Sequence, residues 1–156
     1  MADTFKVERS TTIAAAPETV FSFIDDFRQW THWSPWEKLD ADLERTYSGA
    51  ESGVGARYGW NGKKAGAGTM EIVTADPGAL VAIDLRFTKP FKAENPTRFV
   101  LTPEGSGTRV IWTMTGQHNL MSKLMGLFMS MDKMVGKDFE SGLAALKTAS
   151  EAKAGA

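Results

Sequence analysis

Residues 119–148 have the sequence NLMSKLMGLFMSMDKMVGKDFESGLAALKT, which is the only long helical pattern in the chain. Asn119 suits the N-cap position of such a helix. At about 100° per residue, eight side chains fall within a stripe about 80° wide. The stripe consists of Met121, Leu124, Phe128, Met131, Val135, Phe139, Gly142 and Leu146. At about 1.5 Å per residue the helix extends about 45 Å, enough to lie diagonally across a strongly curved sheet.

The beginning of this helix is apolar on all sides. Within residues 120–131, eight of twelve positions carry large apolar side chains, and Leu127 and Met129 lie outside the stripe. Such a helix is either covered all round or contacts something besides its own core. Three alternatives stay open: nearby loops cover it, it forms a flexible methionine-lined mouth of a pocket, or it makes a homodimer or membrane-surface contact. Gly126 and Gly136 predict a kink or a close backbone contact.

The turn chemistry of residues 43–116 predicts an antiparallel meander with one apolar face. Asp76-Pro77-Gly78-Ala79 suits a type II turn, and a four-residue loop at 104–107 forms a second hairpin. The resulting registers pair Met70 with Leu85, Ile72 with Ile83, Thr97 with Met114, Phe99 with Trp112 and Leu101 with Val110. Since the paired side chains are almost all apolar, this face must be covered, and the helix of residues 119–148 is the candidate cover.

A third hairpin is marked by Asn61-Gly62. A two-residue loop and a three-residue loop would place Tyr58 and Trp60 on opposite faces, and the sequence does not choose between them. We expect both side chains to face the apolar side.

The segment before the meander predicts one strand, one short helix and then a broken segment. Residues 5–13 have strand composition, and Pro17 begins a helix with one apolar face. That face consists of Val20, Phe21, Ile24 and Phe27. Trp30, Trp33 and Trp36 then crowd within seven residues, and we expect them to cap one end of the domain or to form a lid.

The composition excludes several classes of function. There are 18 Lys and Arg against 19 Asp and Glu, so no basic excess supports nucleic-acid binding. Without cysteine there is no disulfide, thiolate nucleophile or zinc-thiolate site, and His32 and His118 are the only imidazoles. We therefore expect no metal, no cofactor and no nucleic-acid partner.

Length and hydropathy indicate one domain without a membrane span. Residues 1–6 lack the features of a secretory signal, and no window reaches the roughly 18 apolar residues of a membrane span. We expect a cytoplasmic protein with a single domain at residues 1–148 and a frayed tail at 149–156.

The chain resembles the polyketide cyclase/dehydrase branch of the START-like superfamily, also called SRPBCC and related to the birch pollen allergen. The motifs that carry the resemblance are Arg9-Ser10 with Ile13, Pro17-Glu18-Thr19-Val20-Phe21, Trp33-Ser34-Pro35-Trp36, Gly53-Val54-Gly55, Gly66-Ala67-Gly68 with Met70-Glu71-Ile72, Leu101-Thr102-Pro103 and Gly107-Thr108-Arg109-Val110. It covers about residues 5–146. It implies an α+β helix-grip fold, in which a strongly curved antiparallel sheet of about six or seven strands wraps around a long C-terminal helix, with two short helices after the first strand.

The resemblance further implies an apolar cavity between sheet and helix that binds a lipid-like, aromatic or polyketide-like molecule. The expected walls are Tyr58, Trp60, Met70, Ile83, Leu85, Phe99, Trp112, Met114, Met121, Phe128, Met131 and Val135. One alternative is a cyclase or dehydratase using the same cavity, with His32, Asp132 or Tyr58 as first candidates, although the sequence contains no catalytic signature. Another is a protein-interaction domain with a collapsed pocket and an apolar patch near Leu127 and Met129.

Overall fold

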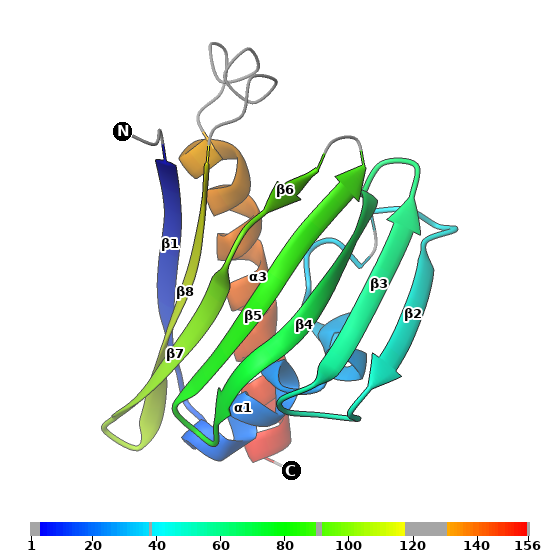
Figure 1. Ribbon diagram of the computed structural model, residues 1–156. Helices are drawn as coiled ribbons and strands as arrows, with labels where there is room; N and C mark the ends of the chain where they lie inside the picture. Colours follow the sequence, from blue (N-terminus) through cyan, green and yellow to red (C-terminus); the bar gives the residue numbers. More distant parts are fainter. Residues whose placement is uncertain (1–3, 38, 90–91, 118–130, 156) are drawn as a thin grey trace.

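The computed structural model describes residues 4–37, 39–89, 92–117 and 131–155. These residues form an antiparallel sheet with a short helix, a 3-10 helix and a long helix (Figure 1). The strands are β1 (Thr4–Ile13), β2 (Glu44–Gly49), β3 (Ala56–Gly62), β4 (Gly66–Asp76), β5 (Leu80–Lys89), β6 (Ala93–Glu94), β7 (Thr97–Glu104) and β8 (Gly107–Gln117). The helices are α1 (Pro17–Ile24), η1 (Phe27–His32) and α3 (Met131–Ala154).

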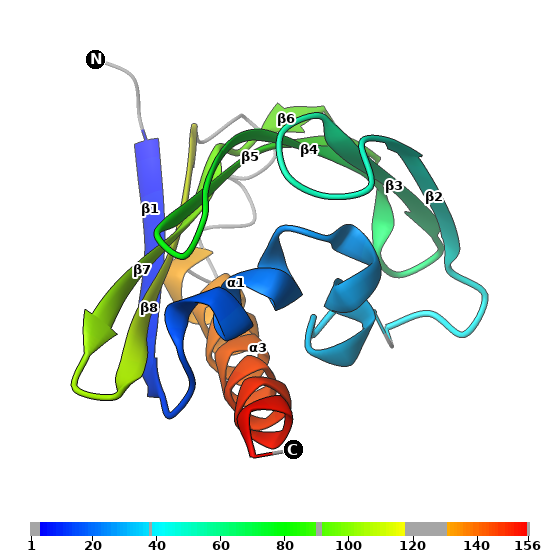
Figure 2. The ribbon, with the colours of Figure 1, turned by 90° about the horizontal axis from the view of Figure 1, so that it is seen from below.

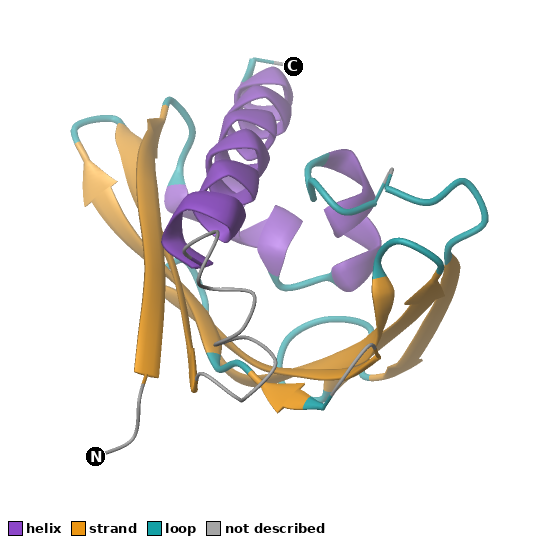
Figure 3. Cartoon of the chain, turned by 90° about the horizontal axis from the view of Figure 1, so that it is seen from above, coloured by secondary structure: helices purple, strands orange, loops and turns teal. Residues whose placement is uncertain are grey.

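The sheet is curved and unclosed, and the helices lie on its concave side (Figures 2 and 3). Its strand order is β1-β8-β7-β5-β4-β3-β2, with β6 paired to β5. Among the elements of the sheet, α3 packs mainly against β1, at one edge. The predicted α+β helix-grip fold is confirmed, with eight strands in the described sheet instead of six or seven. The two-residue strand β6 is too short to leave a periodic pattern in the sequence.

The predicted strand registers are confirmed. The structure pairs Met70 with Leu85, Ile72 with Ile83, Thr97 with Met114, Phe99 with Trp112 and Leu101 with Val110. At the β4–β5 turn the loop comprises residues 77–79, because Asp76 pairs with Leu80, and a bulge at Val73 then restores the predicted register. Gly78 has the positive φ of 73° that a type II turn requires, and the Ala79 N–H donates to the Asp76 carbonyl at 2.9 Å.

The β3–β4 hairpin has a three-residue loop at residues 63–65, since Gly62 pairs with Gly66. Asn61-Gly62, which was expected to mark the turn, instead ends β3. The Asp40 carboxylate holds this loop by accepting hydrogen bonds from the backbone N–H groups of Lys64 and Ala65, at 2.9 and 2.8 Å. This long-range contact stabilises the loop and could not be inferred from the local sequence. Tyr58 and Trp60 lie on the concave face, as expected.

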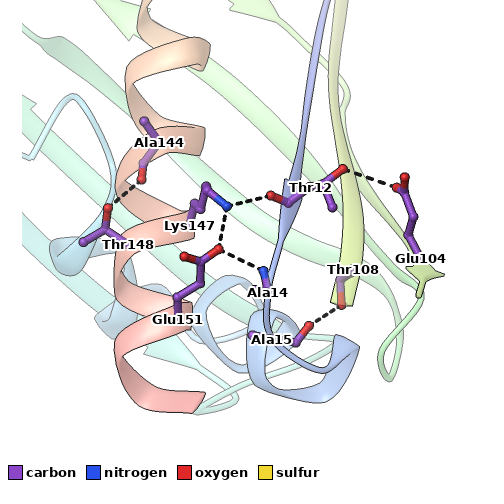
Figure 4. Close-up of polar contacts among 9 residues, drawn as sticks. All are labelled: Thr12, Ala14, Ala15, Glu104, Thr108, Ala144, Lys147, Thr148 and Glu151. Atoms are coloured by element: carbon purple, nitrogen blue, oxygen red, sulfur yellow. Dashed lines mark hydrogen bonds and ion pairs between the residues drawn. The ribbon is translucent and has the colours of Figure 1, made fainter. Parts of the chain in front are cut away.

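The last helix is longer than expected. Instead of ending near Thr148 and fraying from residue 149, α3 continues to Ala154. The reason is a polar anchor in which Lys147 donates to the Thr12 carbonyl at 3.0 Å and Glu151 accepts from the Ala14 N–H at 2.9 Å (Figure 4). Residues 119–130, the first part of the predicted helix, lie outside the described residues. No helix that the structure describes is long and apolar enough to cross a membrane.

This anchor predicts a pH-dependent contribution of Glu151 to stability. The hydrogen bond from Ala14 and the contact with Lys147 lower the pKa of the Glu151 carboxyl. A carboxylate with a lowered folded-state pKa stabilises the fold above its unfolded value of about 4.3, and that stabilisation is lost as the pH falls through the folded-state pKa. Glu151→Gln should therefore lower the urea midpoint at neutral pH, and the difference from the wild type should shrink in acid.

Urea denaturation followed by circular dichroism measures both midpoints. Glu51→Gln, which changes an exposed carboxylate, is the control and should leave the midpoint unchanged. A Glu151→Gln midpoint equal to that of the wild type at neutral pH would contradict the anchor, as would a difference that persists undiminished in acid.

Candidate functional site

A cavity of about 280 Å³ lies between the concave face of the sheet and α3. The segment after η1 and strands β3, β4, β5, β7 and β8 form its walls together with α3. The core below it is closed by side chains such as Ile72, Phe99 and Val110, which are fully buried. Because α3 lies along the β1 edge, the concave face over β3 to β5 is only partly covered by helix, and the cavity lies in this region.

Seven of the twelve expected wall residues line this cavity. They are Tyr58, Trp60, Met70, Leu85, Trp112, Met114 and Val135. Ile83 and Phe99 do not line it, because both are buried in the packed core. Met121 and Phe128 lie outside the described residues, and nothing is described of the Met131 side chain.

An aromatic stack joins α3 to the sheet at one side of the cavity. The Trp112 ring stacks on Phe139 of α3, with centroids 3.9 Å apart and 6° between the ring planes. Phe99 stacks against Trp112 at 4.8 Å, and Trp36 meets Trp112 edge-on at 5.9 Å. The stack joins β7, β8 and α3, and of its rings Trp36, Trp112 and Phe139 line the cavity.

Two of the three tryptophans after α1, Trp30 and Trp36, line the cavity, and Trp33 is buried in the core. The buried indole N–H groups of Trp30 and Trp33 donate to the backbone carbonyls of Ile24 and Phe23, each at 2.8 Å. These hydrogen bonds attach the 3-10 helix to the end of α1 and satisfy both indoles. Trp30 and Trp36 line the cavity, so the segment forms part of its wall.

On the β3 side, glycine allows a large ring to lie flat on the sheet. A Cβ atom on Gly68 would lie 2.5 Å from Cη2 of Trp60, so only glycine fits beneath this indole. The Trp60 N–H donates to the Ala65 carbonyl at 3.2 Å. Tyr58 stacks beside Trp60, with the planes 20° apart and the centroids at 6.2 Å.

One corner of the cavity is charged. Glu37 is only 7% exposed, and its Oε2 accepts a hydrogen bond from Arg45 Nε at 2.5 Å. Arg45 Nη2 also donates to the Glu37 carbonyl at 2.8 Å. The Tyr58 hydroxyl donates to Oε1 of the same carboxylate at 3.3 Å. Burial, and secondly the negative charge of Glu37, raise the pKa of Tyr58 well above its usual value, so this phenol keeps its proton.

Two further polar residues, Asn95 and Thr97, line the cavity and hydrogen-bond to the backbone. The Asn95 Nδ2 donates to the Thr115 carbonyl at 3.2 Å, and the Thr97 hydroxyl donates to the Asn95 carbonyl at 2.9 Å. Sequence reasoning missed both residues and also Glu37. Glu37 follows Trp33-Ser34-Pro35-Trp36 in an irregular segment, where no periodicity indicates which side chains face inward. The one feature of the sequence that could have indicated a polar group in the cavity is a carboxylate directly after an aromatic cluster.

Of the residues first considered for catalysis, Tyr58 lies in the cavity. His32 is exposed on η1, where its ring meets Phe23 edge-on at 6.2 Å, and it does not line the cavity. His118 lies outside the described residues, and nothing is described of the Asp132 side chain.

The close approach of α3 to the sheet depends on Gly142. A Cβ atom there would lie 2.9 Å from Cζ3 of Trp112 and 3.0 Å from Cδ of Pro35, both parts of rigid rings. Alanine favours a helix over glycine by about 1 kcal/mol, but overpacking costs about 1–3 kcal/mol. Gly142→Ala should therefore lower the free energy of unfolding by about 1 kcal/mol, the middle of the range that these two effects leave, measured by urea denaturation.

Gly155→Ala is the matched control at the end of α3. A Cβ atom there meets nothing closer than 3.5 Å, so this variant should be near neutral. A Gly142→Ala variant as stable as the wild type would contradict the tight packing of Trp112 beneath α3.

Residues 4–151 match the family described as polyketide cyclase/dehydrase and lipid transport. A search of curated protein sequences found no match.

Solved structures of similar fold come from several bacteria. A crystal structure from Chromobacterium violaceum has a TM-score of 0.67 at 16% identity, covering 96% of this chain and 97% of that one. A solution structure from Thermobifida fusca has a TM-score of 0.68 at 19% identity, covering 93% and 92%. The Aha1 dimer from Colwellia psychrerythraea has a TM-score of 0.61 at 16% identity, covering 92% and 96%. At these identities the likeness shows the fold alone.

Proposed function

The chain belongs to the polyketide cyclase/dehydrase and lipid transport family, and on that premise we propose that it binds one small hydrophobic molecule in the cavity between the sheet and α3. The observation that carries the proposal is the cavity itself, which aromatic and aliphatic side chains line on most sides. Apolar pockets with a few placed polar groups are the usual form of small-molecule sites. Glu37 and Tyr58 supply such polar groups here.

The size of the cavity favours a compact ligand. Its volume of about 280 Å³ lies just below the range of roughly 300–1,000 Å³ that ligand pockets span. A molecule of two or three fused or linked rings fits this space better than a lipid with two acyl chains. Burial of about 300 Å² of apolar surface at about 25 cal/mol per Å² supplies about 7 kcal/mol, which corresponds to micromolar binding at best.

The neutral fluorescent probe N-phenyl-1-naphthylamine tests the proposal. We expect a saturable rise of its fluorescence with a stoichiometry of one. Leu85→Trp should abolish this rise, because the added ring fills the cavity from β5. Val73→Trp adds the same ring at an exposed position on β4 and should bind the probe like the wild type.

Circular dichroism establishes that both variants are folded. Fluorescence that increases linearly without saturating, or saturable binding that a folded Leu85→Trp retains in full, would contradict binding in this cavity.

Catalysis on a polyketide-like chain is the second candidate function. It is favoured by the convergence of Glu37 and Tyr58 at one corner of an otherwise apolar space. Such a cavity could fold a reactive chain and exclude water, leaving modest acid–base assistance to these two side chains. A cyclising dehydratase acting on a short poly-β-keto thioester should release one water per molecule, detected by mass spectrometry. The rate with the protein should fall in Tyr58→Phe; a rate equal to that of the uncatalysed reaction would contradict catalysis on this substrate.

Homodimer formation through residues 120–131 stays a prediction from the sequence, because most of this segment lies outside the described residues. The solved Aha1 structure is that of a dimer, which supports testing the oligomeric state but does not identify the contact surface.

A further inference from the structure

We propose that Glu37 and Tyr58 make the cavity selective for hydrophobic molecules that carry a hydroxyl or another uncharged hydrogen-bond donor, and that they disfavour carboxylates. This inference rests on the proposed function, because it assigns a chemical class to the ligand of the same cavity. It is carried by the hydrogen-bond geometry of the charged corner.

The hydrogen-bond donors at the charged corner already donate to other groups of the protein. Tyr58 has a single O–H, and it donates to Oε1 of Glu37 at 3.3 Å. The Arg45 Nε and Nη2 groups donate to the side chain and the backbone of Glu37. Arg45 itself does not line the cavity. Acceptor lone pairs on the Tyr58 oxygen and on the carboxylate are therefore what this corner offers to a bound molecule.

An acceptor-only corner discriminates between polar groups of a ligand. A ligand hydroxyl can donate to the Tyr58 oxygen or to Glu37 and receives a charge-assisted hydrogen bond in the second case. An ether oxygen finds no donor there unless Tyr58 turns its proton away from Glu37, which would leave a buried carboxylate oxygen without that partner. The raised pKa of Tyr58 means that its proton stays in place in neutral and mildly alkaline solution.

A ligand carboxylate fits this corner least well. Its charge would lie beside the buried carboxylate of Glu37, while Arg45, whose guanidinium compensates Glu37, does not line the cavity. Lys64 also lines the cavity, but its side chain is exposed and gives an anion no buried partner. The corner therefore favours a phenol or alcohol over a fatty acid or aromatic acid.

Three naphthalenes with one ring system and different polar groups test this selectivity. The probes are 2-naphthol, 2-methoxynaphthalene and 2-naphthoate, each measured by displacement of N-phenyl-1-naphthylamine at neutral pH. Because a hydrogen bond to a charged group is worth about 1.5–3 kcal/mol, 2-naphthol should bind at least about tenfold more tightly than 2-methoxynaphthalene. The naphthoate should bind most weakly of the three.

Variants assign the selectivity to the two residues. Glu37→Gln should reduce the preference for 2-naphthol over 2-methoxynaphthalene to less than about threefold, because the amide supplies a donor as well as an acceptor. Tyr58→Phe removes the hydroxyl without changing a charge, and should weaken 2-naphthol more than 2-methoxynaphthalene even if Glu37→Gln fails to fold. Glu71→Gln alters the Glu71–Arg57 pair, which does not line the cavity, and should retain the wild-type order.

The outcomes separate this inference from the proposed function. Equal binding of 2-naphthol and 2-methoxynaphthalene, tightest binding of 2-naphthoate, or unchanged preferences in Tyr58→Phe would overturn the donor selectivity and leave cavity binding intact. If N-phenyl-1-naphthylamine itself shows no saturable binding, the proposed function fails and the donor selectivity fails with it.

Discussion

The stack of Trp112 on Phe139 is the contact on which the arrangement of this molecule depends. It seats α3 against the β1 and β8 side of the sheet, and Gly142 allows the rings to approach the helix backbone. Because the sheet curves and the helix lies at one side, a single helix cannot cover the whole concave face. The segment after η1 contributes aromatic rings to the remaining part, and a cavity is left between these rings and strands β3 to β5.

The buried carboxylate at the charged corner of this cavity lowers the stability of the fold, and packing alone gives no reason for its presence. Burying a carboxylate beside apolar side chains is unfavourable even when an arginine compensates it, and an apolar replacement of such a pair is often neutral or stabilising. Glu37 nevertheless lies 7% exposed at the cavity wall, with Arg45 and Tyr58 bonded to it. Ligand selectivity is a physical reason to retain the buried Glu37–Arg45 pair, because binding sites commonly lose some stability in exchange for function.

Turn chemistry and periodicity predicted the strands, their pairing and the long helix. Loop lengths, the end of the helix and the charged corner depend on long-range contacts and were not predicted. The Pro-Gly turn after Asp76 was located correctly because turn geometry is local, but the predicted β4–β5 pairs hold only because the bulge at Val73 offsets the extra loop residue. The β3–β4 loop was ambiguous, because Asp40, which stabilises it, lies more than twenty residues away. The end of α3 was placed too early, since its last turns are held by the backbone of Ala14. Glu37 was missed because an irregular segment has no period that indicates which side chains point inward.

The central claim is that the space between the sheet and α3 is a ligand site. A crystal structure of the protein grown with N-phenyl-1-naphthylamine tests it most directly. We expect one probe molecule between the Tyr58 and Trp60 rings on one side and Val135 and Phe139 on the other. A cavity filled by the protein's own side chains, or a probe bound only outside it, would contradict a ligand site in this space.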